Sequence, residues 1–146
     1  MTQLSKYFAL SEMTVSQSAA RRGLKNIPFG KQLDNLRSTA EKMDAIREML
    51  GKPVLVSSGY RNAEVNALVR GSKTSAHCHG LAVDFTCPGY GNPLAVAKAV
   101  LAMGIEFDQL IHEYGAWVHI GFAEPGKPSR RQLLTINKRG TQLGLL

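Results

Sequence analysis

Three side chains of the types that bind metal ions stand out in this chain. Residues 75–84 read SAHCHGLAVD and hold two imidazoles, a thiol and a carboxylate, although the whole sequence has only four histidines. Within this stretch Gly80 allows a turn between His77 and Asp84. Catalytic zinc sites use three such ligands and leave a fourth position for water. The sequence therefore indicates a zinc site at His77, Asp84 and the more distant His119, with purely structural histidines as the competing interpretation.

A general base can be placed beside that site from the pattern of the later chain. Two short apolar runs flank a Tyr-Gly-Ala turn at residues 114–116 and predict a β-hairpin. If Glu113 pairs with Trp117 across the turn, side-chain alternation puts Glu113 on the same face as His119. The two would be diagonal neighbours, with Cα atoms roughly 6–8 Å apart. From there the carboxylate can accept a proton from a water at the metal.

The remaining reactive side chains have more than one interpretation. Arg61 follows a buried strand and a glycine turn, so it is either a surface charge or a cation directed at a developing oxyanion or a substrate carboxylate. Cys78 and Cys87 are expected to be packed, reduced thiols, although a thiolate is also a zinc ligand. His79 and His112 are expected to have structural or surface roles, with His112 on the opposite face of the hairpin.

The elements that must position these residues predict an α+β fold, with a mostly antiparallel sheet and helices packed on one side of it. Apolar residues recur at three- and four-residue steps through residues 31–50, which predicts a long amphipathic helix that ends at Gly51. Helices and strands do not alternate regularly, which argues against a doubly wound parallel sheet. Further strands are predicted at 54–57, 81–86, 108–113, 117–122 and 131–137, and further helices at 63–69 and 93–103.

Length and composition limit the remaining choices. The 146 residues fit a single domain, residues 1–146, with an N-terminal arm at 1–30 and a loosely held tail at 138–146. The arm is expected to contain one short helix capped by Ser11. The net charge of +7 favours an anionic partner, either nucleic acid or a cell envelope. The N-terminus lacks the apolar core of a secretory signal, and no apolar run is long enough to predict a membrane span.

Three ordered motifs resemble one known family. They are Ser-x-His-x-x-Gly-x-Ala-x-Asp at residues 75–84, Trp-x-His at 117–119 and Ser-Gly-Tyr-Arg at 58–61. These motifs are similar to those of zinc peptidases of the D-alanyl-D-alanine carboxypeptidase type, peptidase family M15, which share the hedgehog-type fold. Leu-Ser-Glu at 10–12 and the helix before Val54 extend the resemblance over nearly the whole chain. The resemblance implies the same fold for this protein.

The resemblance also implies roles for individual residues. One catalytic zinc ion would be bound by His77, Asp84 and His119, and Arg61 would stabilise the transition state. We expect the substrate to be bound by Ser75, Tyr60 and Gln109, with orientation of His77 as the alternative role of Ser75.

In one position the chain departs from the pattern of some family members. Those members carry the catalytic glutamate three residues before the last histidine ligand, where this chain has Ala116. The nearest acid is Glu113, six residues before His119. Because the hairpin argument independently puts Glu113 on the correct face, we assign it as the catalytic base.

The implied activity is hydrolysis of peptidoglycan stem peptides, at either the D-Ala-D-Ala or the L-Ala-D-Glu bond. We expect a monomer that is made in the cytoplasm without a signal peptide and acts on the bacterial cell wall, as a phage lysis enzyme would in the host periplasm. A cytoplasmic dipeptidase is a second enzymatic interpretation. A non-catalytic module of the same fold, either a cell-wall peptide binder or a phage structural component, is the alternative from another class. A nucleic-acid partner is not expected, because no binding motif or basic stripe accompanies the charge.

Overall fold

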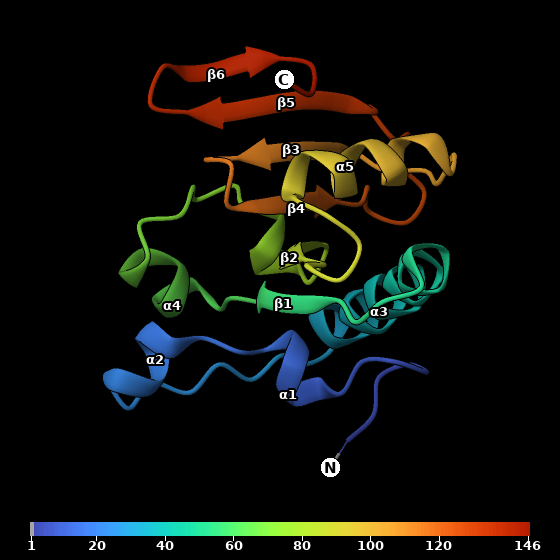
Figure 1. Ribbon diagram of the computed structural model, residues 1–146. Coiled ribbons are helices and arrows are strands. Elements are labelled where there is room, and N and C mark those ends of the chain that lie inside the picture. Colours follow the sequence, from blue (N-terminus) through green and yellow to red (C-terminus); the bar gives the residue numbers. More distant parts are fainter. Residues whose placement is uncertain (1) are drawn as a thin grey trace.

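The computed structural model describes residues 2–146, and at its centre is a six-stranded sheet with the order β1-β2-β4-β3-β5-β6 (Figure 1). All neighbouring strands are antiparallel except β3 and β5, which are parallel. The predicted α+β fold with a mostly antiparallel sheet is therefore confirmed. The strands are β1 (Leu55–Ser58), β2 (Ala82–Thr86), β3 (Gln109–Glu113), β4 (Trp117–Gly121), β5 (Gln132–Asn137) and β6 (Gly140–Leu143).

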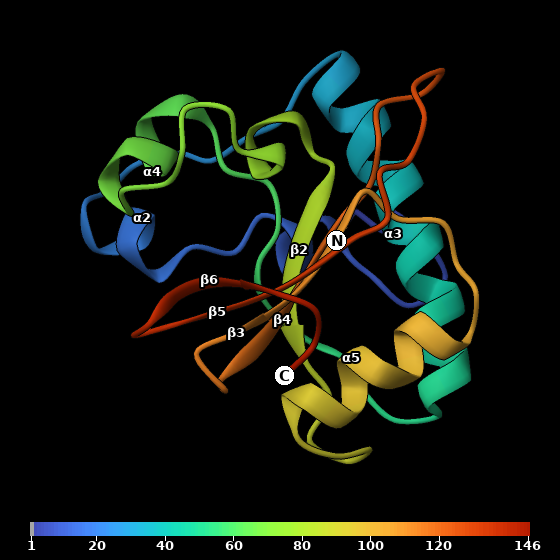
Figure 2. The same cartoon turned by 90° about the horizontal axis from the view of Figure 1, so that it is seen from above.

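The two longest helices, α3 (Lys31–Leu50) and α5 (Pro93–Ala102), cover one face of this sheet, as Figure 2 shows. Helices α2 (Gln17–Arg21) and α4 (Ala63–Leu68) lie on the opposite side (Figure 2), but they leave the face formed by β2, β4 and β3 uncovered. The main core therefore lies between α3, α5 and the covered face. Its fully buried side chains include Leu36, Met43, Ile46, Val96, Val100, Val83, Phe85, Leu110, Val118 and Ile120.

Helix α3 follows the boundaries that its apolar period predicts. Its buried residues recur at helical spacing, and Gly51 ends the helix in the left-handed conformation with φ 69°. Helix α5 begins as its sequence predicts, because the side chain of Asn92 accepts a hydrogen bond from the Ala95 amide and Pro93 occupies the first turn. In the part of the chain that the structure describes, no helix combines the length and apolarity needed to cross a bilayer.

The N-terminal arm contains two short helices where one was predicted. Helix α1 (Leu10–Met13) starts after Ala9, whose amide donates to the Glu12 carboxylate at 3.0 Å, so the predicted cap at Ser11 is wrong. Helix α2 follows, and the side chain of Ser16 caps it. The arm is held against α3, because Asp44 accepts hydrogen bonds from Ser5, Lys6 and Tyr7.

The C-terminal segment is more ordered than predicted. Residues 140–143 form β6, which pairs with β5 across a tight turn at Lys138 and Arg139. Gly140 has φ 97°, a conformation that glycine adopts without strain. The expectation of a loose tail at 138–146 is therefore corrected. The order of this segment comes from its backbone hydrogen bonds with β5 and from packing of Leu145 against the core, and neither contact can be read from composition.

The β3–β4 hairpin has the predicted register, with Glu113 opposite Trp117 and Ile111 opposite His119. After β4 the chain passes around the start of β3 through residues 122–131 and enters β5 at the same end of the sheet. This connection is fixed to the start of β3 by an ion pair in which the Arg130 guanidinium donates three hydrogen bonds to the two carboxylate oxygens of Asp108, at 2.7, 3.0 and 3.1 Å between heavy atoms. The uncovered face of the sheet thus gains a wall beside β3 and β4.

Candidate metal centre and active site

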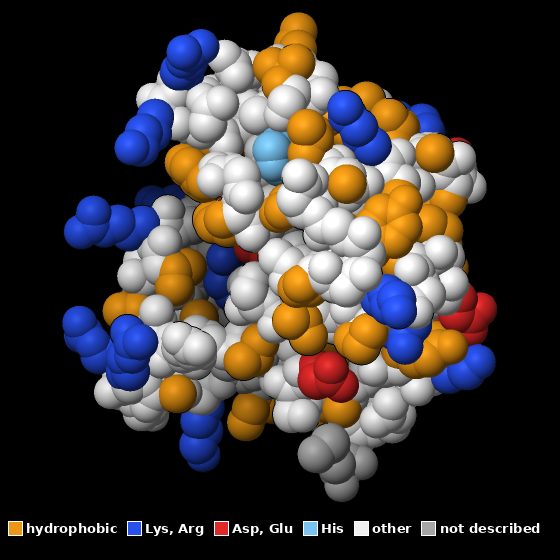
Figure 3. Space-filling view, in the orientation of Figure 1, with side chains coloured by type: hydrophobic (Ala, Val, Ile, Leu, Met, Phe, Trp, Pro, Cys, Tyr) orange, Lys and Arg blue, Asp and Glu red, His pale blue; other side chains and the backbone are white. Residues whose placement is uncertain are grey.

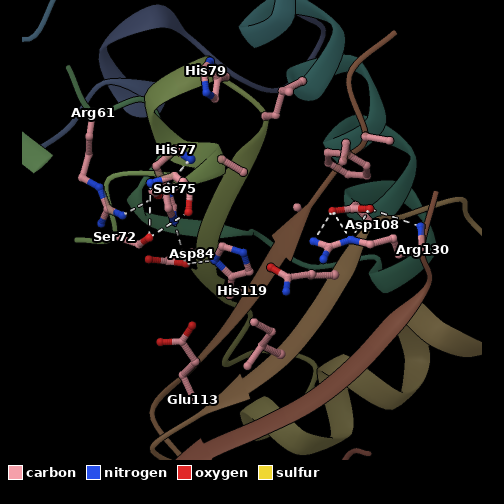
Figure 4. Close-up of a pocket in the computed structure, with 18 of the residues that line it drawn as sticks. Arg61, Ser72, Ser75, His77, His79, Asp84, Asp108, Glu113, His119 and Arg130 are labelled. Carbon is pink, nitrogen blue, oxygen red and sulfur yellow. Dashed lines mark hydrogen bonds and ion pairs between the residues drawn. The ribbon is translucent and has the colours of Figure 1, made fainter. Parts of the chain in front are cut away.

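The structure brings His77, Asp84 and His119 together on the uncovered face of the sheet (Figure 4). Asp84 of β2 lies directly opposite His119 of β4. His77 comes from the 3₁₀ helix η1 (Ala76–His79), which ends at Gly80 with φ 73°. His119 Nδ1 lies 2.9 Å from Asp84 Oδ1, and His77 Nε2 lies 3.3 Å from the same oxygen.

A carbonyl group fixes the orientation of the His77 ring. Nδ1 of His77 lies 2.7 Å from the Gly59 carbonyl oxygen, and the residue is almost fully buried. A carbonyl can only accept, so Nδ1 carries the proton and Nε2 presents its lone pair to Asp84. Gly59 is in this position because β1 is irregular between Val56 and Ser58, which turns the chain out of the strand. Metal-binding histidines are commonly held by such a second partner.

The protonation states of the cluster favour a bound cation. Burial lowers the pKa of His77 and keeps the ring neutral, against the opposing effect of Asp84. Burial raises the pKa of the Asp84 carboxyl, but contacts with His119 and His77 outweigh burial and hold that pKa well below its ordinary range. A neutral nitrogen lone pair therefore faces a carboxylate oxygen, an arrangement that is repulsive until a cation lies between them.

The donor set also fits zinc by type and spacing. Two imidazole nitrogens and one carboxylate oxygen are a ligand set of catalytic zinc sites, and the candidate atoms all lie within 4.8 Å of one another. Tetrahedral coordination with bonds of about 2.0–2.1 Å separates ligand atoms by roughly 3.4 Å. The distances of 2.9 and 3.3 Å to the Asp84 oxygen are close to that separation.

This cluster lies in an open groove of about 1060 Å³. Alternate residues of the hairpin line it, and Glu113 is among them, on the same face as His119. Burial raises the pKa of the Glu113 carboxyl, and the negative charge of Asp84 raises it further, while His119 and Arg61 act in the opposite direction. A carboxyl group with a raised pKa, close to a metal-binding cluster, has the properties of a general base.

Arg61 and Ser75 lie together beside η1 (Figure 4). The Ser75 hydroxyl accepts hydrogen bonds from Arg61 Nη2 and from the His77 amide, both at 3.2 Å. The Arg61 amide donates to the His77 carbonyl at 3.1 Å. Arg61 Nε is buried and has no hydrogen-bond partner among the described residues. The guanidinium therefore has donor capacity left for an acceptor in the groove.

The other two predicted substrate-binding residues differ in position. Gln109 lines the groove, and its amide nitrogen donates to Gln132 at 2.7 Å. Tyr60 does not line the groove, because it is 2% exposed and its hydroxyl donates to Gln32 at 3.0 Å. The expectation for Tyr60 is corrected on this geometry, which gives the residue a packing role.

The remaining candidates lie outside the ligand cluster. His112 is on the opposite face of β3, and its Nδ1 lies 3.0 Å from the Leu146 carbonyl oxygen. His79 is exposed at the rim of the groove. Cys78 and Cys87 are both free thiols, and the Cys87 sulfur lies 3.6 Å from the Lys52 carbonyl oxygen.

Two features of the site were not predicted from the sequence. One is the carbonyl of Gly59, whose role depends on a contact between residues 18 positions apart. The other is Arg70, which lines the groove from the loop after α4 and has φ 58°. The only sequence signal for Arg70 was its place just before Gly71, at the end of a predicted helix.

Comparison with protein families agrees with this geometry. The family model described as Peptidase M15 matches residues 6–121, most of the chain. No curated protein matches the sequence. The matched residues include the three candidate metal ligands together with Glu113 and Arg61. The chain therefore belongs to peptidase family M15, and it is a metallopeptidase by family.

Proposed function

We propose that this protein hydrolyses peptide bonds of peptidoglycan stem peptides, using one zinc ion held by His77, Asp84 and His119. The observation that carries the proposal is the convergence of these ligand atoms in the same groove as the Glu113 carboxylate. The formal charge of +7 favours association with an anionic cell envelope. An endolysin-like role in degrading the wall follows from this substrate.

The residues around the ligands divide the chemistry among them. When bound, zinc supplies an electrophile that polarises the scissile carbonyl and makes water more acidic. Glu113 accepts the proton of the attacking water at its carboxylate and transfers it to the nitrogen of the leaving amine. The Arg61 guanidinium donates hydrogen bonds to the oxygen that becomes negatively charged. Ser75 holds that guanidinium at 3.2 Å, so it acts by positioning.

The proposal is tested with purified peptidoglycan and mass analysis of the products. We expect cleavage that is lost on chelation and restored by zinc. Glu113→Gln should retain the metal and lose turnover, because an amide cannot accept the proton. Glu124→Gln is the matched control, since Glu124 lines the same groove but is paired with Lys127 at 3.3 Å.

Two results would contradict the proposal. Binding of peptidoglycan without product under any metal would favour a non-catalytic module of the same fold. Turnover of Glu113→Gln close to that of the unmodified protein would remove Glu113 as the base. The masses of the products also identify the cleaved bond, because loss of one terminal D-Ala and cleavage after L-Ala give different fragments.

A further inference from the structure

The cationic side chains of the groove are distributed unevenly. Four of them line it: Arg61, Arg70, Lys127 and Arg130. Lys127 and Arg130 are each paired with a carboxylate, at 3.3 and 2.7 Å. Arg61 and Arg70 form no ion pair with any acid among residues 2–146. The groove is therefore close to neutral beside the 122–131 connection and positively charged beside α4 and η1.

The surface shows the same asymmetry. In Figure 3, Lys and Arg side chains gather along the left side of the molecule, where α4 lies in Figure 1, around a hollow in the surface. The acidic side chains visible at the surface in this view lie mainly away from that edge (Figure 3). An anionic group that approaches this side of the groove is attracted to it.

Arg70 has an unusual backbone conformation for its residue type. It follows Val69, which ends α4, and adopts φ 58° while its amide donates to the Ala67 carbonyl at 3.1 Å. This left-handed position after a helix is normally taken by glycine or asparagine. Arginine is strained there, and strain of this kind is concentrated at functional sites. The conformation places an exposed arginine on the wall of the groove.

The loop that carries Arg70 is held in place and presents hydroxyl groups to the same wall. The Asn66 side-chain amide is buried and donates to the Ser72 carbonyl at 2.9 Å. The hydroxyls of Ser72 and Thr74 lie 3.0 Å apart, and both residues line the groove. Arginine with adjacent hydroxyls is a donor set suited to a carboxylate, which accepts two parallel hydrogen bonds from a guanidinium.

We propose that Arg70 is a specificity residue that binds a carboxylate of the substrate on the α4 side of the metal cluster. The inference rests on the proposed function, because it concerns the peptide in the same groove. Beyond the proposed function, the preferred substrate carries a free carboxylate at that place, and Arg70 recognises this carboxylate without taking part in bond cleavage.

The decisive variant is Arg70→Gly. Glycine adopts the left-handed conformation without strain, so this variant should melt at the same or a higher temperature than the unmodified protein. A change in substrate recognition by this variant therefore cannot be attributed to damage to the fold. Lys73→Ala is the matched control, because it removes one positive charge from the same loop at a residue that does not line the groove.

The probes are stem pentapeptides ending in D-Ala-D-Ala in which either the terminal carboxylate or the D-Glu α-carboxylate is replaced by a carboxamide. For the unmodified protein, amidation of one of the two should lower kcat/KM about 10-fold or more, mainly through KM. Arg70→Gly should lose this discrimination and keep kcat on the amidated peptide, while Lys73→Ala should keep the discrimination. Which amide is disfavoured identifies the carboxylate.

Binding of the same peptides to Glu113→Gln, measured by calorimetry, gives a readout that does not depend on turnover. If carboxylate and carboxamide peptides bind differently and Arg70→Gly abolishes the difference, the inference stands even if no peptide is cleaved. If the unmodified protein cleaves the carboxylate peptide and both carboxamide peptides with equal kcat/KM, the inference fails and the proposed function stands. The inference would also be overturned if Arg70→Gly weakened binding of the carboxylate and the carboxamide peptides to the same extent, or if no peptide bound at all.

Discussion

The Gly59→Ala substitution tests the link between the N-terminal arm and the side chains of the candidate metal site. A Cβ atom at residue 59 would overlap the Met13 carbonyl oxygen and lie 2.9 Å from the Met13 carbonyl carbon. The Tyr60 amide donates to that same oxygen at 2.8 Å. On its other side, the Gly59 carbonyl holds Nδ1 of His77 at 2.7 Å. The added methyl group must therefore displace either the arm or the carbonyl that orients His77, a proposed metal ligand.

The expected losses of stability and of metal affinity follow from these contacts. Backbone atoms must move by roughly 1 Å, and overpacking of this kind costs about 1–3 kcal/mol. Weakening of the hydrogen bond to Met13 adds about 1 kcal/mol. For a chain of this length the sum lowers the melting temperature by roughly 5–15 °C. Disturbance of the second partner of a metal-binding histidine typically lowers metal affinity about 10- to 100-fold.

The assay combines thermal unfolding with zinc affinity measured by competition with a chelator. Gly104→Ala is the control, because Gly104 has φ 79° and open space around it, so alanine there costs about 1–2 kcal/mol without a clash. We expect Gly104→Ala to lose stability and keep zinc affinity, and Gly59→Ala to lose both. An unchanged melting temperature for Gly59→Ala would refute the packing argument. An unchanged zinc affinity despite lost stability would refute the link to His77.

Three further predictions concern other parts of the molecule. In the metal-free protein, carboxyl NMR should show Glu113 titrating above the ordinary glutamate pKa of about 4.3, and zinc should lower that pKa; a pKa at the ordinary value would contradict the burial argument. Hydrogen bonds from Arg130 lower the pKa of Asp108, so this pair stabilises the fold above about pH 3.9 and the contribution is lost as pH falls through the lowered pKa. Asp108→Asn should accordingly reduce the pH dependence of the unfolding free energy at acid pH, measured by urea unfolding. An unchanged pH dependence would show that the pair does not contribute to stability. Asn26→Ala removes hydrogen bonds to two backbone carbonyls and one backbone amide and should lower the unfolding free energy by about 2–3 kcal/mol in the same assay, whereas a loss below about 0.5 kcal/mol would contradict this role.

Much of the fold could be predicted because its signals are local. The apolar period of residues 31–50, the cap at Asn92 and the turn at 114–116 each determine an element within a few positions. Pairing Glu113 with Trp117 across the turn sets the hairpin register, and side-chain alternation then puts Glu113 on the face of His119. These inferences needed no knowledge of the rest of the chain.

The features that were missed depend on contacts between distant residues. Tyr60 follows a strand and a glycine and directly precedes Arg61, a position from which we expected it to reach the substrate. Its ring instead packs in the core, and its hydroxyl reaches Gln32 of α3. Strand β6 exists because β5 offers it a free edge, although its own sequence is poor in strand-forming residues. Spacing in the sequence carries no information about such partners.

The match to the Peptidase M15 model ends at residue 121, yet the groove does not. The far wall, made by residues 122–131 and by Ile136 of β5, comes from chain that lies after every residue assigned to the chemistry. The residues proposed for catalysis and the residues that shape this wall thus lie in separate, consecutive stretches of sequence. An exchange of the 122–131 connection, with Asp108 and Arg130 kept as its attachment, would change the peptides that fit while the proposed metal ligands and the proposed base stay unaltered. The chain is in this respect built as a reaction centre with a replaceable selectivity segment.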